Sequence, residues 1–174
     1  KHLTKTDSDD MQSQFQSITV RIFLASPGDV RDERELARRV IEQIRHERVF
    51  RGRVELECIA WDQSGMEVAM EASLTPQEAI KRGLPKPSEC DLVVVIFWSR
   101  MGTPLPAPDY TKPDGTPYRS GTEWEYQDAI RAARETGRPA VWLYRRTQVP
   151  APRFDDPDYD EKRNQWQKVE SFFK

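Results

Sequence analysis

The stretch SGTEWEYQDAIRAA, residues 120–133, contains a glutamate that could serve either structure or chemistry. Glu125 follows Thr122 by three residues at the expected start of a helix, which is the spacing of a capping box. The positive end of the helix dipole would favour the ionised form of a carboxylate placed there. An ionised carboxylate can stabilise or attack an oxocarbenium-like centre, but it is a poor general acid. Two interpretations of Glu125 therefore stay open: a helix cap, and a group that promotes cleavage of an N-glycosidic bond to ribose.

A second group of candidate residues follows the first apolar segment, in the stretch ASPGDV. Ser26, together with backbone N–H groups around Gly28 at a helix N-terminus, could hold phosphate or ribose hydroxyls. Alternatively, Pro27 and Gly28 only form the turn and Asp29 caps the helix. Neither GxxxxGK[ST] nor GxGxxG occurs, so the sequence gives no support for ATP hydrolysis.

Two tryptophans and one arginine are further candidates. Trp98 and Trp61 each end an expected strand and could stack on a planar base, although aromatic residues also occupy strand ends for packing alone. Arg34, beside Glu33 in the first turn of the first expected helix, opposes the helix dipole. It could serve a partner or an anion, or it could form a surface ion pair.

Composition excludes several other classes of function. The only histidines are His2 and His46, and Cys58 and Cys90 form no metal-ligand spacing. We therefore expect no zinc site and no Ser-His or Cys-His triad, and we interpret both cysteines as buried, unpaired residues. The formal net charge of -2 gives no general attraction to nucleic acid. No apolar run is long enough to cross a membrane, and we expect a soluble, cytoplasmic domain.

Hydrophobic periodicity predicts strands that alternate with helices. Residues 17–26, 53–62, 90–99 and 140–146 are expected strands, residues 31–48, 75–84, 120–136 and 164–174 are expected helices, and residues 100–119 and 147–164 are expected loops. In the first helix, one face collects the apolar residues Leu36, Ala37, Val40, Ile41 and Ile44. The strand around Leu92–Trp98 is apolar on both faces and is predicted to be central.

This alternation predicts a three-layer, flavodoxin-like α/β fold with a mostly parallel sheet and helices on both faces. For a strand order of 2-1-3-4, ligands would bind between the carboxyl ends of the first and third strands. Those strands end at Ser26–Val30 and Trp98–Pro104, and we expect Glu125 near the same edge. We interpret residues 1–16 as a disordered tail, in part left by a cloning vector, and residues 17–174 as one domain that continues into a larger protein.

Three blocks of the sequence resemble the DUF4062 family, a TIR-like domain at the N-terminus of NACHT-type and related STAND ATPases. The blocks are VRIFLASPGDVRDERELARRVIEQI, CDLVVVIFWSRMGTP and SGTEWEYQDAIRAA, and the similarity spans residues 18–173. The third block also resembles nucleoside 2-deoxyribosyltransferases. The sequence departs from typical TIR domains in having Glu123 and Trp124 before Glu125 in place of a Trp-Cys pair, and Pro-Gly after the first strand.

The resemblance implies roles for named residues. Glu125 corresponds to the glutamate that promotes cleavage of nicotinamide from NAD in catalytic TIR domains, and to the nucleophile of the deoxyribosyltransferases. Ser26, Pro27, Gly28 and Asp29 would face the substrate. Trp98, Ser99, Arg100 and Gly102 would form the opposite wall. No metal and no cofactor are implied, since NAD would be the substrate.

The resulting expectation is an effector or signalling domain of a bacterial antiphage defence protein that hydrolyses NAD when the parent protein oligomerises. A non-enzymatic adaptor is the first alternative, and it would self-associate through the loop at residues 100–119 and the charged first helix. A deoxyribosyltransferase-like enzyme is the second alternative.

Overall fold

A computed structural model describes residues 17–60, 78–79, 82–106 and 108–174 of the chain. Its centre is a four-stranded sheet with the order β2-β1-β3-β4, in which every neighbouring pair is parallel. The elements are β1 (Ile18–Ala25), η1 (Gly28–Val30), α1 (Arg31–His46), β2 (Val54–Ile59), η2 (Pro87–Glu89), β3 (Leu92–Phe97), α3 (Gly121–Thr136), β4 (Ala140–Arg145) and α4 (Tyr159–Phe172). The predicted strand order is confirmed.

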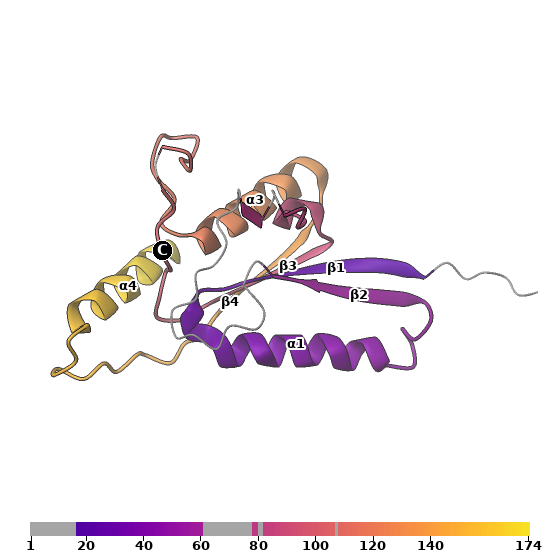
Figure 1. Cartoon of the computed structure of the whole chain (residues 1–174), viewed down its shortest axis with the longest axis horizontal. Coiled ribbons are helices and arrows are strands. Elements are labelled where there is room, and N and C mark those ends of the chain that lie inside the picture. Colours follow the sequence, from indigo (N-terminus) through magenta and orange to yellow (C-terminus); the bar gives the residue numbers. More distant parts are fainter. Residues whose placement is uncertain (1–16, 61–77, 80–81, 107) are drawn as a thin grey trace, which may run out of the picture.

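Helices cover both faces of the sheet, as Figure 1 shows. One face buries Phe23, Val93 and Val95 beneath α3 and α4, which contribute Ala129 and Val169 to the same core cluster. The other face buries a smaller cluster of Leu24, Val30 and Ile96, against which Ala37 of α1 packs. The three-layer, flavodoxin-like α/β architecture predicted from the sequence is therefore confirmed.

The central position of β3 follows from its sequence. Its side chains alternate between the two faces, and the run LVVVIF supplies an apolar residue to both. Leu92–Phe97 pairs along its whole length with Ala140–Arg145, and Leu92–Val95 pairs with Ile22–Ala25. The topological switch point, where the connections run outward in opposite directions, thus lies between β1 and β3.

The expected apolar face of α1 is only partly buried. Ala37 and Ile41 are half-buried, but Leu36, Val40 and Ile44 have exposed fractions of 54%, 43% and 36%. Instead, Arg34 is buried in the first turn of the helix. Helical spacing places the five residues on one side of α1, as expected, but only Ala37 and Ile41 of this group are partly buried.

The helices on the other face begin and end where capping chemistry allows. Gly137, with φ of 79°, ends α3 in the left-handed conformation that glycine adopts without steric cost. Helix α4 begins at Tyr159, inside the segment expected to be a loop, and its first turn contains Asp160 and Glu161. These acids suit the positive end of a helix, and the predicted start at residue 164 was too late.

Several predicted features lie wholly or partly outside the described residues. The expected tail at residues 1–16 and Trp61 lie outside the described residues, as does half of the helix expected at residues 75–84. Neither Cys58 nor Cys90 forms a disulfide, and Cys90 is buried as predicted, whereas Cys58 is only half-buried. Within the described ranges, no helix has the length and apolar character needed to cross a membrane.

Candidate functional site

The turn after β1 and the loop after β3 are joined at the carboxyl edge of the sheet by one carboxylate. Asp29 Oδ2 accepts hydrogen bonds from Ser99 N at 2.8 Å, Ser99 Oγ at 2.9 Å and Arg100 N at 2.9 Å. Asp29 does not cap α1, whose N-terminus has no side-chain cap. The capping interpretation of Asp29 is therefore wrong, and the side chain instead links the two segments expected to face each other across a ligand site.

The second oxygen of this carboxylate has no hydrogen-bond partner in the described part of the chain. Asp29 Oδ1 is buried and accepts no hydrogen bond from any described residue. A buried acceptor without a donor costs free energy, and such atoms are rare in folded proteins. Asp29 Oδ1 can therefore accept a hydrogen bond from a hydroxyl group or a water molecule that enters the site.

At Gly102 the loop after β3 passes close to the N-terminus of α3 and to the turn after β1. The Gly102 φ of 108° is a conformation that other residues rarely adopt, and a Cβ atom at this position would lie 3.0 Å from Ser120 Cβ and 3.8 Å from Pro27 Cβ. The loop after β3 thus passes between the turn after β1 and the first residue of α3. The structure brings together Pro27, Asp29, Ser99, Arg100 and Gly102, as the sequence predicted.

Two buried polar side chains that the sequence did not single out in these roles support the loops. Gln165 of α4 accepts hydrogen bonds from Met101 N at 3.0 Å and Gly102 N at 3.3 Å. Arg34 donates from Nε to Ser26 Oγ at 2.8 Å and from Nη2 to Pro27 O at 3.2 Å. Arg34 is buried, and it bonds to the turn after β1. These hydrogen bonds hold the turn after β1 in place, and the hydroxyl of Ser26 is the acceptor of one of them.

The N-terminus of α3 differs from the prediction. Ser120 is the cap, and its Oγ accepts a hydrogen bond from Glu123 N at 3.1 Å. Glu123 is 1% exposed, and its carboxylate pairs with Lys112 at 2.9 Å and with Arg119 Nε at 3.3 Å. The capping pair of Thr122 and Glu125 is wrong. A signal for the correct pair was present, because Ser120-x-x-Glu123 has the same spacing in the same stretch.

Glu125 is therefore not part of the capping pair of α3. It is half-buried, and helical periodicity places it on the side of α3 that also contains the buried residues Thr122 and Ala129. Its distance along the helix axis from Ser120 is about 7.5 Å. Glu125 therefore lies one to two turns from the junction of Ser120, Gly102 and Pro27, on the sheet-facing side of the helix.

The ring face and the indole N–H of Trp98 both contact other residues of the protein. The Arg146 guanidinium lies 4.1 Å from the centroid of its ring, and the indole N–H donates to Gln148 O at 2.7 Å. Arg146 in turn forms an ion pair with Glu33 at 2.8 Å. A planar cation thus already stacks on Trp98, and a base could use the same face only if Arg146 moved.

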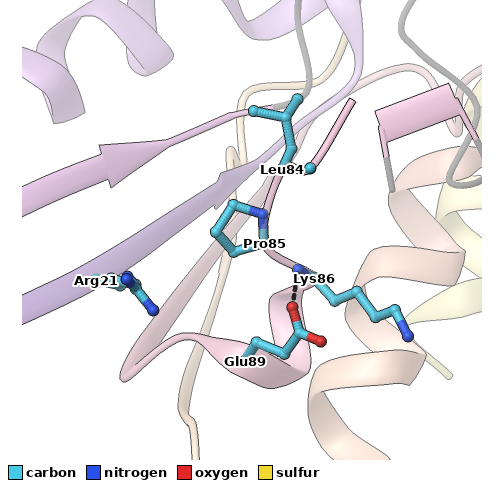
Figure 2. Close-up of a pocket in the computed structure, with 6 residues that line it drawn as sticks. Arg21, Leu84, Pro85, Lys86 and Glu89 are labelled. Carbon is cyan, nitrogen blue, oxygen red and sulfur yellow. Dashed lines mark hydrogen bonds between the residues drawn. The ribbon is translucent and has the colours of Figure 1, made fainter. Parts of the chain in front are cut away.

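An open cavity of about 620 Å³ lies elsewhere, beside the start of β3. Figure 2 shows Arg21, Leu84, Pro85, Lys86 and Glu89 around it. Glu89, the acidic residue that lines this cavity, accepts a hydrogen bond from Lys86 N at 2.9 Å. Arg21 forms an ion pair with Glu57 at 3.0 Å. Ligands of parallel α/β sheets bind at the opposite edge, so we assign the candidate site to that edge. We call it the Asp29 junction, and it consists of Pro27, Asp29, Ser99, Arg100 and Gly102.

The described residues contain no cluster of three or more His, Cys, Asp or Glu side chains that could hold a metal ion. Comparison of the chain with protein-family models, with curated proteins and with solved structures gave no match. The chemistry of the site therefore has to be argued from its own residues.

Proposed function

We propose that the domain is a TIR-like effector that binds NAD or a related nucleotide at the Asp29 junction and hydrolyses its nicotinamide-ribose bond. The observation that supports this most directly is the buried, unpartnered Oδ1 of Asp29 at the switch point of a parallel sheet. A ribose hydroxyl is a neutral donor that satisfies such an acceptor. Ser26, Gly28, Ser99 and Arg100 border the same position with hydroxyl and backbone groups suited to a phosphorylated sugar.

The proposed chemistry requires one carboxylate. The bond between ribose C1′ and the pyridinium nitrogen breaks, and its electron pair leaves with nicotinamide, which becomes neutral and needs no general acid. The Glu125 carboxylate stabilises the positive charge that develops at C1′. Water then adds to C1′ and loses a proton to solvent, which gives ADP-ribose and a proton.

Glu123 has a different role from Glu125 in this proposal. Glu123 is neutralised by Lys112 and Arg119 and holds the N-terminus of α3. In this proposal Glu123 positions the helix, and Glu125 touches the substrate.

The test is to incubate the concentrated or artificially clustered domain with NAD and to follow free nicotinamide by chromatography. We expect Glu125→Gln to reduce release by about 10²-fold or more, as for loss of one electrostatic group in an active site. The matched control is Glu135→Gln, at an exposed position of the same helix, which should keep full activity. Equal release by wild type and Glu125→Gln would exclude the proposed role.

Two alternatives are separated by the same samples. Release of free base from nucleosides, but not from NAD, would favour a deoxyribosyltransferase-like enzyme. Absence of cleavage with all substrates, together with concentration-dependent assembly, would favour a non-enzymatic adaptor. The exposed aliphatic residues of α1 are the observation that keeps the adaptor alternative in consideration.

A further inference from the structure

Helix α1 presents a row of aliphatic side chains to solvent. Leu36, Val40 and Ile44 are all exposed, and their spacing of four residues places them along one side of the helix. Single exposed apolar residues are ordinary on a protein surface, but three in a row along one helix form a continuous strip. We call these three residues the α1 strip.

Two ion pairs show which way the α1 strip faces. Glu33, which lies on the same side of the helix as the strip, bonds to Arg146 just after β4. Arg45 lies nearer the opposite side and approaches Glu55 of β2 at 4.0 Å. The α1 strip therefore borders the part of the sheet face that belongs to β3 and β4.

That part of the sheet face is also exposed. Trp142 and Tyr144 pair in register with Val94 and Ile96, so they project on the same face of the sheet as α1. Their exposed fractions are 54% and 52%. Parallel sheets are normally covered by helices on both faces, so a helix is the element expected beside the α1 strip.

The sequence of α1 indicates which helix could pack beside the α1 strip. At intervals of four residues it reads Asp32, Leu36, Val40 and Ile44, and Arg48 follows in the turn, two residues after the helix ends at His46. This series is self-complementary when two copies run antiparallel about a two-fold axis at Val40. Leu36 then meets Ile44 of the second copy, and Asp32 lies at the end of the contact near the turn that contains Arg48 of the second copy.

The charges at the two ends support a second copy over an unrelated partner. Asp32 and Arg48 are exposed, and within the described part of the chain neither has an ion-pair partner. Antiparallel pairing also places the acidic first turn of each helix, with Asp32 and Glu33, beside the basic last turn of the other, with Arg45 and His46. An isologous contact uses one surface twice, so each complementary pair occurs twice.

We propose that two copies of this chain associate through antiparallel packing of α1 against α1, with the α1 strip at the centre and Trp142 and Tyr144 at its border. The contact is small, so we expect a weak dimer whose population rises with concentration. This inference does not depend on the proposed cleavage of NAD.

The experiment is sedimentation velocity of the chain from about 1 μM to about 1 mM, a range that brackets weak association. We expect a concentration-dependent shift from monomer to dimer. Val40→Asp places two carboxylates at the two-fold axis and should weaken the dimer at least tenfold. The matched control is Val149→Asp, the same change at a site that is 66% exposed and outside α1, and it should leave the dimer intact. Circular dichroism checks that both variants fold.

Charge reversal tests the register and the identity of the partner. Asp32→Arg and Arg48→Asp should each weaken the dimer about fivefold, and less so at high salt. The double variant Asp32→Arg/Arg48→Asp should restore the dimer, because both pairs are re-formed with exchanged signs. A chain that stays monomeric at the highest concentration, a Val40→Asp variant that dimerises like wild type, or a double variant weaker than both single variants would overturn the proposal.

Discussion

Glu123 is the residue whose loss should destabilise the fold most clearly. Its carboxylate is 1% exposed and accepts hydrogen bonds from Lys112 Nζ at 2.9 Å and from Arg119 N at 2.6 Å. The side chain of Lys112 is 19% exposed, so the lysine is only partly able to recover water when its partner is removed. Breaking one side of a buried ion pair costs about 3–5 kcal/mol, and the partial exposure of Lys112 favours the lower end of this range.

We therefore expect Glu123→Ala to lower the free energy of unfolding by about 3 kcal/mol, which corresponds to about 6–12 °C in Tm for a chain of this size. The assay is urea unfolding followed by circular dichroism. Glu135→Ala, at an exposed position on the same helix, is the matched control and should change stability by less than about 0.5 kcal/mol. In a double-mutant cycle, Lys112→Met should cost much less in the Glu123→Ala background than in wild type. A loss below about 1 kcal/mol for Glu123→Ala would refute the assignment of a buried, stabilising ion pair.

Three further predictions use the same unfolding assay or thiol labelling. Gly102→Ala should destabilise the fold more than Gly115→Ala, by about 1–2 kcal/mol, because both glycines have positive φ but only Gly102 has Ser120 Cβ within 3.0 Å of the added methyl group. Asp29→Ala should lower the free energy of unfolding by about 2–3 kcal/mol, because the hydrogen bonds to Ser99 and Arg100 are lost. Asp29→Asn keeps one acceptor oxygen and should lower it less. Equal losses for the two variants would contradict the role of the carboxylate oxygen. Burial raises the pKa of the Cys90 thiol to about 12, so at pH 8 it is almost wholly protonated; we expect iodoacetamide to label it only after unfolding, and rapid labelling in the native state would contradict its burial.

The fold could be predicted because its signals are strong and local. The run from Leu92 to Phe97 is apolar on both faces, which only a central strand requires, and strands alternate with helices along the chain. The meeting of Asp29 with Ser99 and Arg100 followed from topology alone, since parallel strands place their carboxyl ends at one edge. Fold class and the position of the candidate site were therefore accessible without coordinates.

The errors arose where distant residues decide between local alternatives. The stretch SGTEWE contains two overlapping capping patterns, and the choice of Ser120 with Glu123 is reinforced by Lys112, a loop residue that local spacing does not reveal. The burial of Arg34 in the first turn of α1, where it bonds to Ser26 and Pro27, was likewise not predicted. Buried polar contacts of this kind have no periodic signature in a sequence.

The Asp29 junction has a consequence for the order in which the protein is made. Asp29 and Ser99 are 70 residues apart, so the link between them forms only after β3 has been synthesised and has paired with β1. A nascent chain that ends before residue 99 contains the turn after β1 but has no donors for Asp29 from the β3 loop. The candidate site is therefore a late product of folding, and a partly made or partly unfolded chain should lack the surface that we propose binds a nucleotide.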